Sequence, residues 1–272
     1  MPAPFSLRLA LSWTVLATAA LWLGIALVFL AFPHAAQSIV LLGAVQVAVY
    51  ALVLALFASA QGTGFGELLA LRKAPIVMCI AAAVLGFMLQ IPATLLSNAI
   101  EHFFPTPAAV LAERAARITP HSSMQAAAIF FVVAALGPCV EEFFFRGALF
   151  GALRRGHGAV VTAVAVAACF ALGHVDARLF LPLFVTALAL GEVRELSGSV
   201  WPGVALHGAF NAATLGVVFA GAAPDGKPPP MPVFTAILGC VTTAGLLFLV
   251  RRLALSSRVA QNARSRDLRN PS

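Results

Sequence analysis

The stretch Glu141-Glu142-Phe143-Phe144-Phe145-Arg146 places two acids and a base inside an otherwise apolar sequence. A charged side chain at the centre of a membrane helix costs about 2.5–3.5 kcal/mol on insertion scales, so it faces the protein interior and marks a functional site. Three ionisable residues so close together indicate such a site. The remainder of the chain is interpreted as the scaffold that brings partners to these carboxylates.

The composition predicts a membrane protein over the whole length. The 272 residues are 61% hydrophobic and 10% charged, and the mean hydropathy is +0.97. A soluble globular domain is typically about 25% charged, so water-soluble classes are excluded. Because no segment is long or polar enough to form a second domain, residues 1–272 are predicted to form a single membrane domain.

Eight apolar segments are predicted to cross the bilayer as helices. They cover 9–32, 38–60, 74–97, 124–153, 159–173, 179–193, 200–220 and 232–250. The long fourth segment is expected to kink at Gly137-Pro138. Between the third and fourth segments, 108–118 mixes apolar and charged residues and predicts a short amphipathic helix on the membrane surface. The predicted fold class is therefore all-α and polytopic, with about eight transmembrane helices.

The distribution of basic residues predicts the orientation. Those near residues 8, 72–73, 154–155 and 194 fall on the same side as the arginines of the tail, 251–272, and fewer fall on the other side. The positive-inside rule then places both termini in the cytoplasm. The basic tail is expected to contact anionic lipid. Nucleic acid is not a predicted partner, because no recognition motif accompanies the arginines.

The first, second, third and last segments are interpreted as clean apolar spans, whereas the four from 124 to 220 contain ionisable groups. This asymmetry predicts a functional core of four helices inside a framework of four others. The catalytic core is therefore expected at about 124–220.

Within the core, Glu142 and Arg146 are four residues apart and share one face of a helix. An ion pair between them would reduce the cost of burying either charge. Glu141 lies about 100° further round the helix and lacks that partner. Glu142 is therefore the predicted structural acid, and Glu141 is the candidate general base.

Two further segments contribute polar side chains. Phe170 and His174 share a face at the end of one, and His207 and Asn211 share a face on another. A set of Glu, His and Asn without a neighbouring Ser or Cys nucleophile suits the activation of water, with Asn211 donating to an oxyanion. Peptide hydrolysis fits this set. Zinc held by Glu141, His174 and His207 is an alternative, although the H-E-x-x-H signature is absent.

At these positions the chain resembles the CPBP family of intramembrane proteases, also called the ABI or CAAX-protease family, which includes the type II CAAX prenyl endopeptidases. The family pattern E-E-x-x-x-R, F-x-x-x-H and H-x-x-x-N is matched by Glu141-Glu142…Arg146, by Phe170…His174 and by His207…Asn211. The match covers roughly residues 124–220. Elsewhere the likeness is limited to apolar helices and a basic tail.

The resemblance implies an intramembrane endopeptidase in which Glu141 activates water with His174. It also implies that His207 and Asn211 form the oxyanion hole, with Glu142 and Arg146 supporting the site. The glutamate mechanism needs no metal and is favoured over a zinc mechanism. The substrate is expected to be a membrane-associated peptide or protein, and whether it is prenylated is left open. Short loops and an Ala- and Arg-rich composition favour the inner membrane of a bacterium.

Two other classes compete with a protease. A transporter could use the same acids as a proton relay, but the two halves show no internal repeat and the polar residues cluster in the second half. A catalytically idle scaffold or immunity protein is the other alternative. The complete set of motifs disfavours it.

Overall fold

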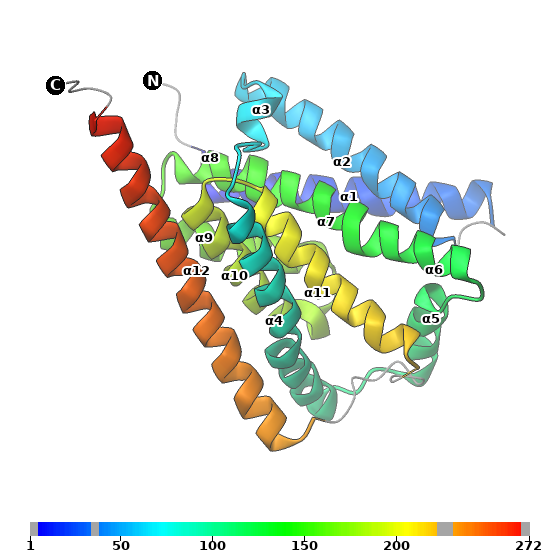
Figure 1. The fold of residues 1–272 in the computed structure, drawn as a ribbon. Coiled ribbons are helices and arrows are strands. Elements are labelled where there is room, and N and C mark those ends of the chain that lie inside the picture. The colour runs from blue at the N-terminus through cyan, green and yellow to red at the C-terminus, as the bar shows by residue number, and fades with distance from the viewer. Residues whose placement is uncertain (1–4, 34–37, 222–230, 268–272) are drawn as a thin grey trace.

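The computed structural model describes residues 5–33, 38–221 and 231–267. These residues form a helical bundle and include no strand (Figure 1). The helices are α1 (Leu7–Ala31), α2 (Ile39–Gln61), α3 (Phe65–Leu68), α4 (Ile76–Phe103), α5 (Ala108–Ile118), α6 (Ser123–Phe130), α7 (Gly137–Glu142), α8 (Phe150–Arg154), α9 (Ala159–Gly173), α10 (Ala177–Ser197), α11 (Trp201–Phe219) and α12 (Val233–Asp267). Two π-helical stretches, η1 (Phe131–Leu136) and η2 (Phe143–Leu149), join α6, α7 and α8 into one continuous segment.

Each of the eight apolar segments contains a helix, so the all-α class is confirmed. Six helical segments of the described chain are long and apolar enough to cross a membrane: α1, α2, α4, the segment from α6 to α8, α11 and α12 up to Leu255. The apolar helix α9 is shorter, and α10 is not among the six. The protein is therefore a multi-pass integral membrane protein. The full number of eight spans stays a prediction.

Short polar residues and glycines set several helix boundaries. The side chains of Ser6 and Ser38 accept backbone N–H groups in the first turns of α1 and α2, and Asp176 does the same for α10. The helices α2 and α10 end at Gly62 and Gly198, both in the left-handed conformation that glycine adopts without strain. The helix predicted at 108–118 is α5, whose bounds are the same.

Helix α11 is packed tightly between its neighbours. A Cβ atom at Gly86 of α4 would lie only 2.0 Å from the carbonyl oxygen of Leu206, and one at Gly208 would lie 2.6 Å from the carbonyl oxygen of Ala134. Only glycine permits these approaches, which fix α11 against α4 on one side and η1 on the other. In Figure 1, α12 runs beside α4 at one edge of the bundle, and α1 and α2 lie at the opposite edge.

The irregularity expected at Gly137-Pro138 is a change of helix type. The π-helical stretch η1 ends immediately before this pair, and η2 begins immediately after Glu142. Stretches of π-helix are rare and are frequent at functional sites.

Part of the predicted basic tail falls within α12, which continues as helix to Asp267. The loop around Lys227 and residues 268–272 lie outside the described residues.

Candidate active site

Glu142 and Arg146 form an ion pair in the interior of the bundle. Arg146 Nη1 lies 2.9 Å from Glu142 Oε1, and both side chains are 0% exposed. The guanidinium also donates to the carbonyl oxygen of Ala187 at 3.3 Å, and its carbon lies 4.6 Å from the centre of the Phe170 ring. A buried charge needs such partners, so this geometry suits the structural role expected of Glu142.

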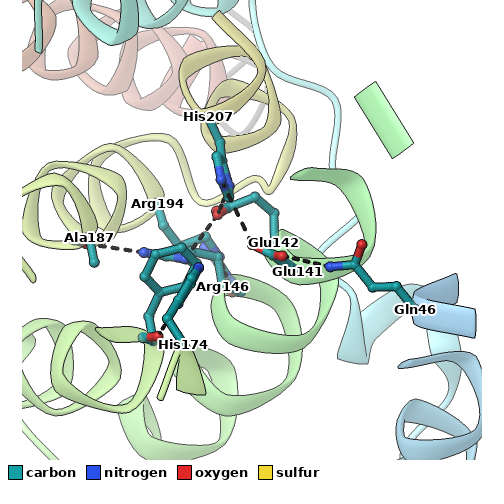
Figure 2. Close-up of polar contacts among 9 residues, drawn as sticks. Gln46, Glu141, Glu142, Arg146, His174, Ala187, Arg194 and His207 are labelled. Carbon is teal, nitrogen blue, oxygen red and sulfur yellow. Dashed lines mark hydrogen bonds and ion pairs between the residues drawn. The ribbon is translucent and has the colours of Figure 1, made fainter. Parts of the chain in front are cut away.

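Glu141 has a different environment from its neighbour. Its side chain is 16% exposed, and its Oε1 accepts a hydrogen bond of 2.7 Å from Nε2 of Gln46 on α2 (Figure 2). Its Oε2 lies 3.8 Å from Nε2 of His207, which is too far for a direct hydrogen bond. The two oxygens of Glu141 therefore differ, since only Oε1 accepts a hydrogen bond from a described side chain.

His207 contacts both acids. Its Nδ1 lies 3.1 Å from Glu142 Oε1, and the ring is 8% exposed. An ionised carboxylate only accepts hydrogen bonds, so Nδ1 must carry the proton, and Nε2 is the nitrogen that faces Glu141.

His174 also packs against the Phe170 ring. Its Nδ1 is 2.8 Å from the carbonyl oxygen of Phe170, an acceptor, so Nδ1 carries the proton and Nε2 is the free nitrogen. The centre of the Phe170 ring is 4.8 Å from that of His174 and 5.6 Å from that of His207. The structure therefore brings both histidines against one aromatic ring. In the described chain His174 makes no ion pair or hydrogen bond with Glu141.

The turn after His174 is held by an ion pair with α5. Val175 has a φ of 54°, a strained conformation for a β-branched residue, and Asp176 pairs with Arg114 of α5. Burial opposes the ionisation of Asp176. The hydrogen bonds from Arg114 and from the Arg178 N–H outweigh this effect and hold the pKa of Asp176 below its usual value.

Asn211 is directed towards the backbone of the acid-bearing segment. Its Nδ2 donates to the carbonyl oxygen of Val133 at 2.8 Å. Pro138 has no N–H with which to bond the carbonyls of the preceding turn, and Val133 lies in that turn. Asn211 thus replaces a lost helix hydrogen bond through one hydrogen of its amide group.

Sequence reasoning missed two contributors to the site. Gln46 lies in α2, a segment interpreted as a clean apolar span of the framework, and its hydrogen bond brings that helix into contact with the candidate base. Arg194, interpreted as a loop charge, lies in the last turn of α10 and donates through Nε to the carbonyl oxygen of Arg146 at 2.8 Å. An amide in an apolar span was the one available signal for Gln46.

The donor set does not fit the zinc alternative. Glu141 and His207 approach each other, but His174 does not join them in the described structure. No group of three His, Cys, Asp or Glu side chains in this part of the chain is arranged to hold a metal ion. No step of the proposed reaction therefore passes through a metal.

Comparison with known proteins identifies the segment that carries these residues. Residues 123–213 match a family model described as "Type II CAAX prenyl endopeptidase Rce1-like". Searches of curated proteins and of solved structures each found no match to the chain. The matched segment runs from α6 into α11 and includes both acids, Arg146, Phe170, both histidines and Asn211. Residues 123–213 of the chain therefore carry an Rce1-like type II CAAX prenyl endopeptidase domain of the CPBP family, a family of intramembrane proteases.

Proposed function

We propose that this protein cleaves a membrane-associated peptide or protein with a water molecule that Glu141 activates. The observation that carries the proposal is the contrast between the two acids. Glu142 is fully buried and paired, whereas Glu141 is partly exposed and directs Oε2 towards the His207 ring. One acid is thus committed to structure, and the other is accessible to a substrate.

In the proposed reaction Glu141 takes a proton from water as the water oxygen attacks the carbonyl carbon of the scissile amide. His207, held at Nδ1 by Glu142, donates to the developing oxyanion from Nε2 in its doubly protonated form, and the second N–H of Asn211 supports it. The unprotonated Nε2 of His174 accepts a hydrogen bond from the attacking water, and Glu141 passes the proton that it took to the leaving nitrogen as the C–N bond breaks. The products are a carboxylic acid and an amine.

The predicted orientation is part of the same proposal. The termini and the basic tail would face the cytoplasm of a bacterium, with the tail against anionic lipid. The substrate would then approach within the inner membrane. A C-terminal CAAX peptide carrying a prenyl group is the first probe to use, because the family description names this chemistry.

The test uses the purified full chain in lipid nanodiscs with two peptides, a farnesylated CAAX peptide and an unprenylated transmembrane peptide. Mass spectrometry follows the products. Replacement of a general base typically lowers the rate about 10²- to 10⁴-fold, so Glu141→Gln should lose turnover to this extent without a change in thermal stability. Glu113→Gln, on an exposed part of α5, is the control and should cleave normally.

Wild-type protein that cuts neither peptide, or a Glu141→Gln variant that cuts at the normal rate, would refute the proposal. A stable but inactive Glu142→Gln variant beside an active Glu141→Gln variant would reverse the roles of the two acids.

A further inference from the structure

Helix α2 contributes an amide side chain, Gln46, that contacts the candidate base, Glu141. Gln46 lies in an apolar span with a mean hydropathy of 2.6. An amide in such surroundings is costly unless it finds a hydrogen-bond partner. Gln90 of α4 and Asn211 of α11, two other amides in this bundle, donate to backbone carbonyl oxygens. Gln46 instead donates to a carboxylate, Oε1 of Glu141, at 2.7 Å (Figure 2).

The attachment of α2 to the acid-bearing segment does not depend on this amide. Nearly one turn before Gln46, a Cβ atom at Gly43 would come within 2.6 Å of the Val132 side chain. One turn after it, the Tyr50 ring packs edge-on against Phe144, with 5.6 Å between ring centres. Close backbone packing and an aromatic pair therefore hold the two helices together on both sides of Gln46.

The hydrogen bond from Gln46 gives the two carboxylate oxygens of Glu141 different environments. Oε1 is occupied by Gln46, and Oε2 faces His207 Nε2. The terminal torsion of a glutamate is broad and roughly two-fold, so an unrestrained carboxylate would rotate. The amide of Gln46 removes this freedom and leaves one oxygen presented to the site.

We propose that Gln46 is a positioning residue for the reaction, which it supports by fixing the Glu141 carboxylate so that Oε2 receives the proton of the attacking water. The proposal rests on the proposed function of Glu141. It adds a group from outside residues 123–213, the segment that matches the family model. A misplacement of about 1 Å in a reacting group can lower a rate 10²-fold, so the loss of Gln46 should lower kcat roughly 10- to 100-fold.

Three variants separate positioning from packing. Gln46→Leu removes the donor and keeps an apolar side chain that α2 accommodates. Gln90→Leu is the matched control, because it removes interhelical hydrogen bonds, to the Phe210 carbonyl and the Thr214 hydroxyl, that do not involve an acid. Gln46→Glu introduces a carboxyl group that donates to Glu141 only when it is protonated. The titratable groups around this position are Tyr50, Glu141, Glu142, Arg146 and His207.

Two measurements are made on each variant in nanodiscs. The first is kcat and KM for the farnesylated CAAX peptide between pH 5 and pH 8, a range set by the usual titration of carboxylates and histidine. The second is the infrared carboxylate band of Glu141, identified as the band that Glu141→Gln removes. This band reports the hydrogen bond whether or not a peptide is cut.

Gln46→Leu should lower kcat at an unchanged KM, shift the infrared band and melt within a few degrees of Gln90→Leu. Gln90→Leu should keep the kcat and the band of the wild type. The activity of Gln46→Glu relative to the wild type should rise as the pH falls, whereas that of Gln46→Leu should not depend on pH.

Normal turnover by Gln46→Leu beside an inactive Glu141→Gln would overturn the positioning role and leave the proposed function intact. An unshifted infrared band in Gln46→Leu would also overturn it. Normal turnover by Glu141→Gln, in contrast, would overturn the proposed function itself.

Discussion

The buried pair of Glu142 and Arg146 predicts an unusual pattern of stability. Both side chains are fully buried, so removal of either one leaves an unpaired charge inside the bundle. Loss of one partner of such a pair is expected to destabilise the protein by about 3–5 kcal/mol. Glu142→Leu and Arg146→Met should each show a loss of this size.

Removal of both charges should be less harmful than the sum of the single changes. The double variant leaves no unpaired charge. It still loses the hydrogen bonds from Arg146 to the Ala187 carbonyl and from His207 to Glu142, each worth about 1 kcal/mol, and the contact of the guanidinium with Phe170, worth about 1–2 kcal/mol. An overall loss of about 3–4 kcal/mol is therefore expected for Glu142→Leu combined with Arg146→Met, well below the sum of the two single changes.

Unfolding in mixed micelles, titrated with a denaturing detergent and followed by tryptophan fluorescence, measures these differences. Arg154→Met is the control, because the pair of Arg154 with Glu195 is partly exposed and should contribute less than about 1 kcal/mol. The reasoning is refuted if Glu142→Leu is as stable as the wild type. It is also refuted if the double variant loses the full sum of the two single changes.

Three further outcomes are expected. Gly86→Ala should destabilise the protein by about 3 kcal/mol or more and abolish cleavage. The added Cβ atom would lie 2.0 Å from the Leu206 carbonyl oxygen, so α11 must move and His207 moves with it. A thermal melt measures the loss of stability, and the peptide assay measures the loss of cleavage. Asp176→Asn keeps the helix cap but loses the charge that pairs with Arg114, so it should lower stability by about 1 kcal/mol or less at neutral pH. The pKa of Asp176 is lowered on folding, so its contribution is present above about pH 4 and is lost as the pH falls further, where melts of variant and wild type should converge. Cleavage should survive dialysis against a metal chelator, since the described donors do not converge on one point; loss of activity that zinc restores would contradict this.

The sequence predicted the all-helical membrane fold because long apolar segments have few alternatives in a bilayer, where every backbone group must be bonded internally. It also predicted that Glu142 and Arg146 would meet, because residues four apart on one helix are neighbours whatever the tertiary structure. Contacts of this kind are local, and periodicity alone decides them.

Contacts between helices were not predictable in the same way. Nothing in the spacing of α2 and α7 states that Gln46 reaches Glu141, because that contact depends on how closely the two helices pack. Likewise, the partner of Asn211 was not foreseen, since it became available only when η1 and Pro138 exposed the Val133 carbonyl. The roles of Glu141, His174, His207 and Asn211 stay predictions until the variants are measured.

The two π-helical stretches on either side of α7 determine the direction in which Glu141 and Glu142 point from the helix axis. A π-helical turn contains more residues than an α-helical turn, so η1 and η2 set the direction in which the short helix between them points. Deletion of a single residue from η1 would rotate Glu141 and Glu142 by about 100° relative to the preceding helix. Such a deletion would turn both acids away from α2 and α11 at once, whereas a point substitution removes only one contact. The length of this segment is therefore as strictly constrained as the identity of its acids.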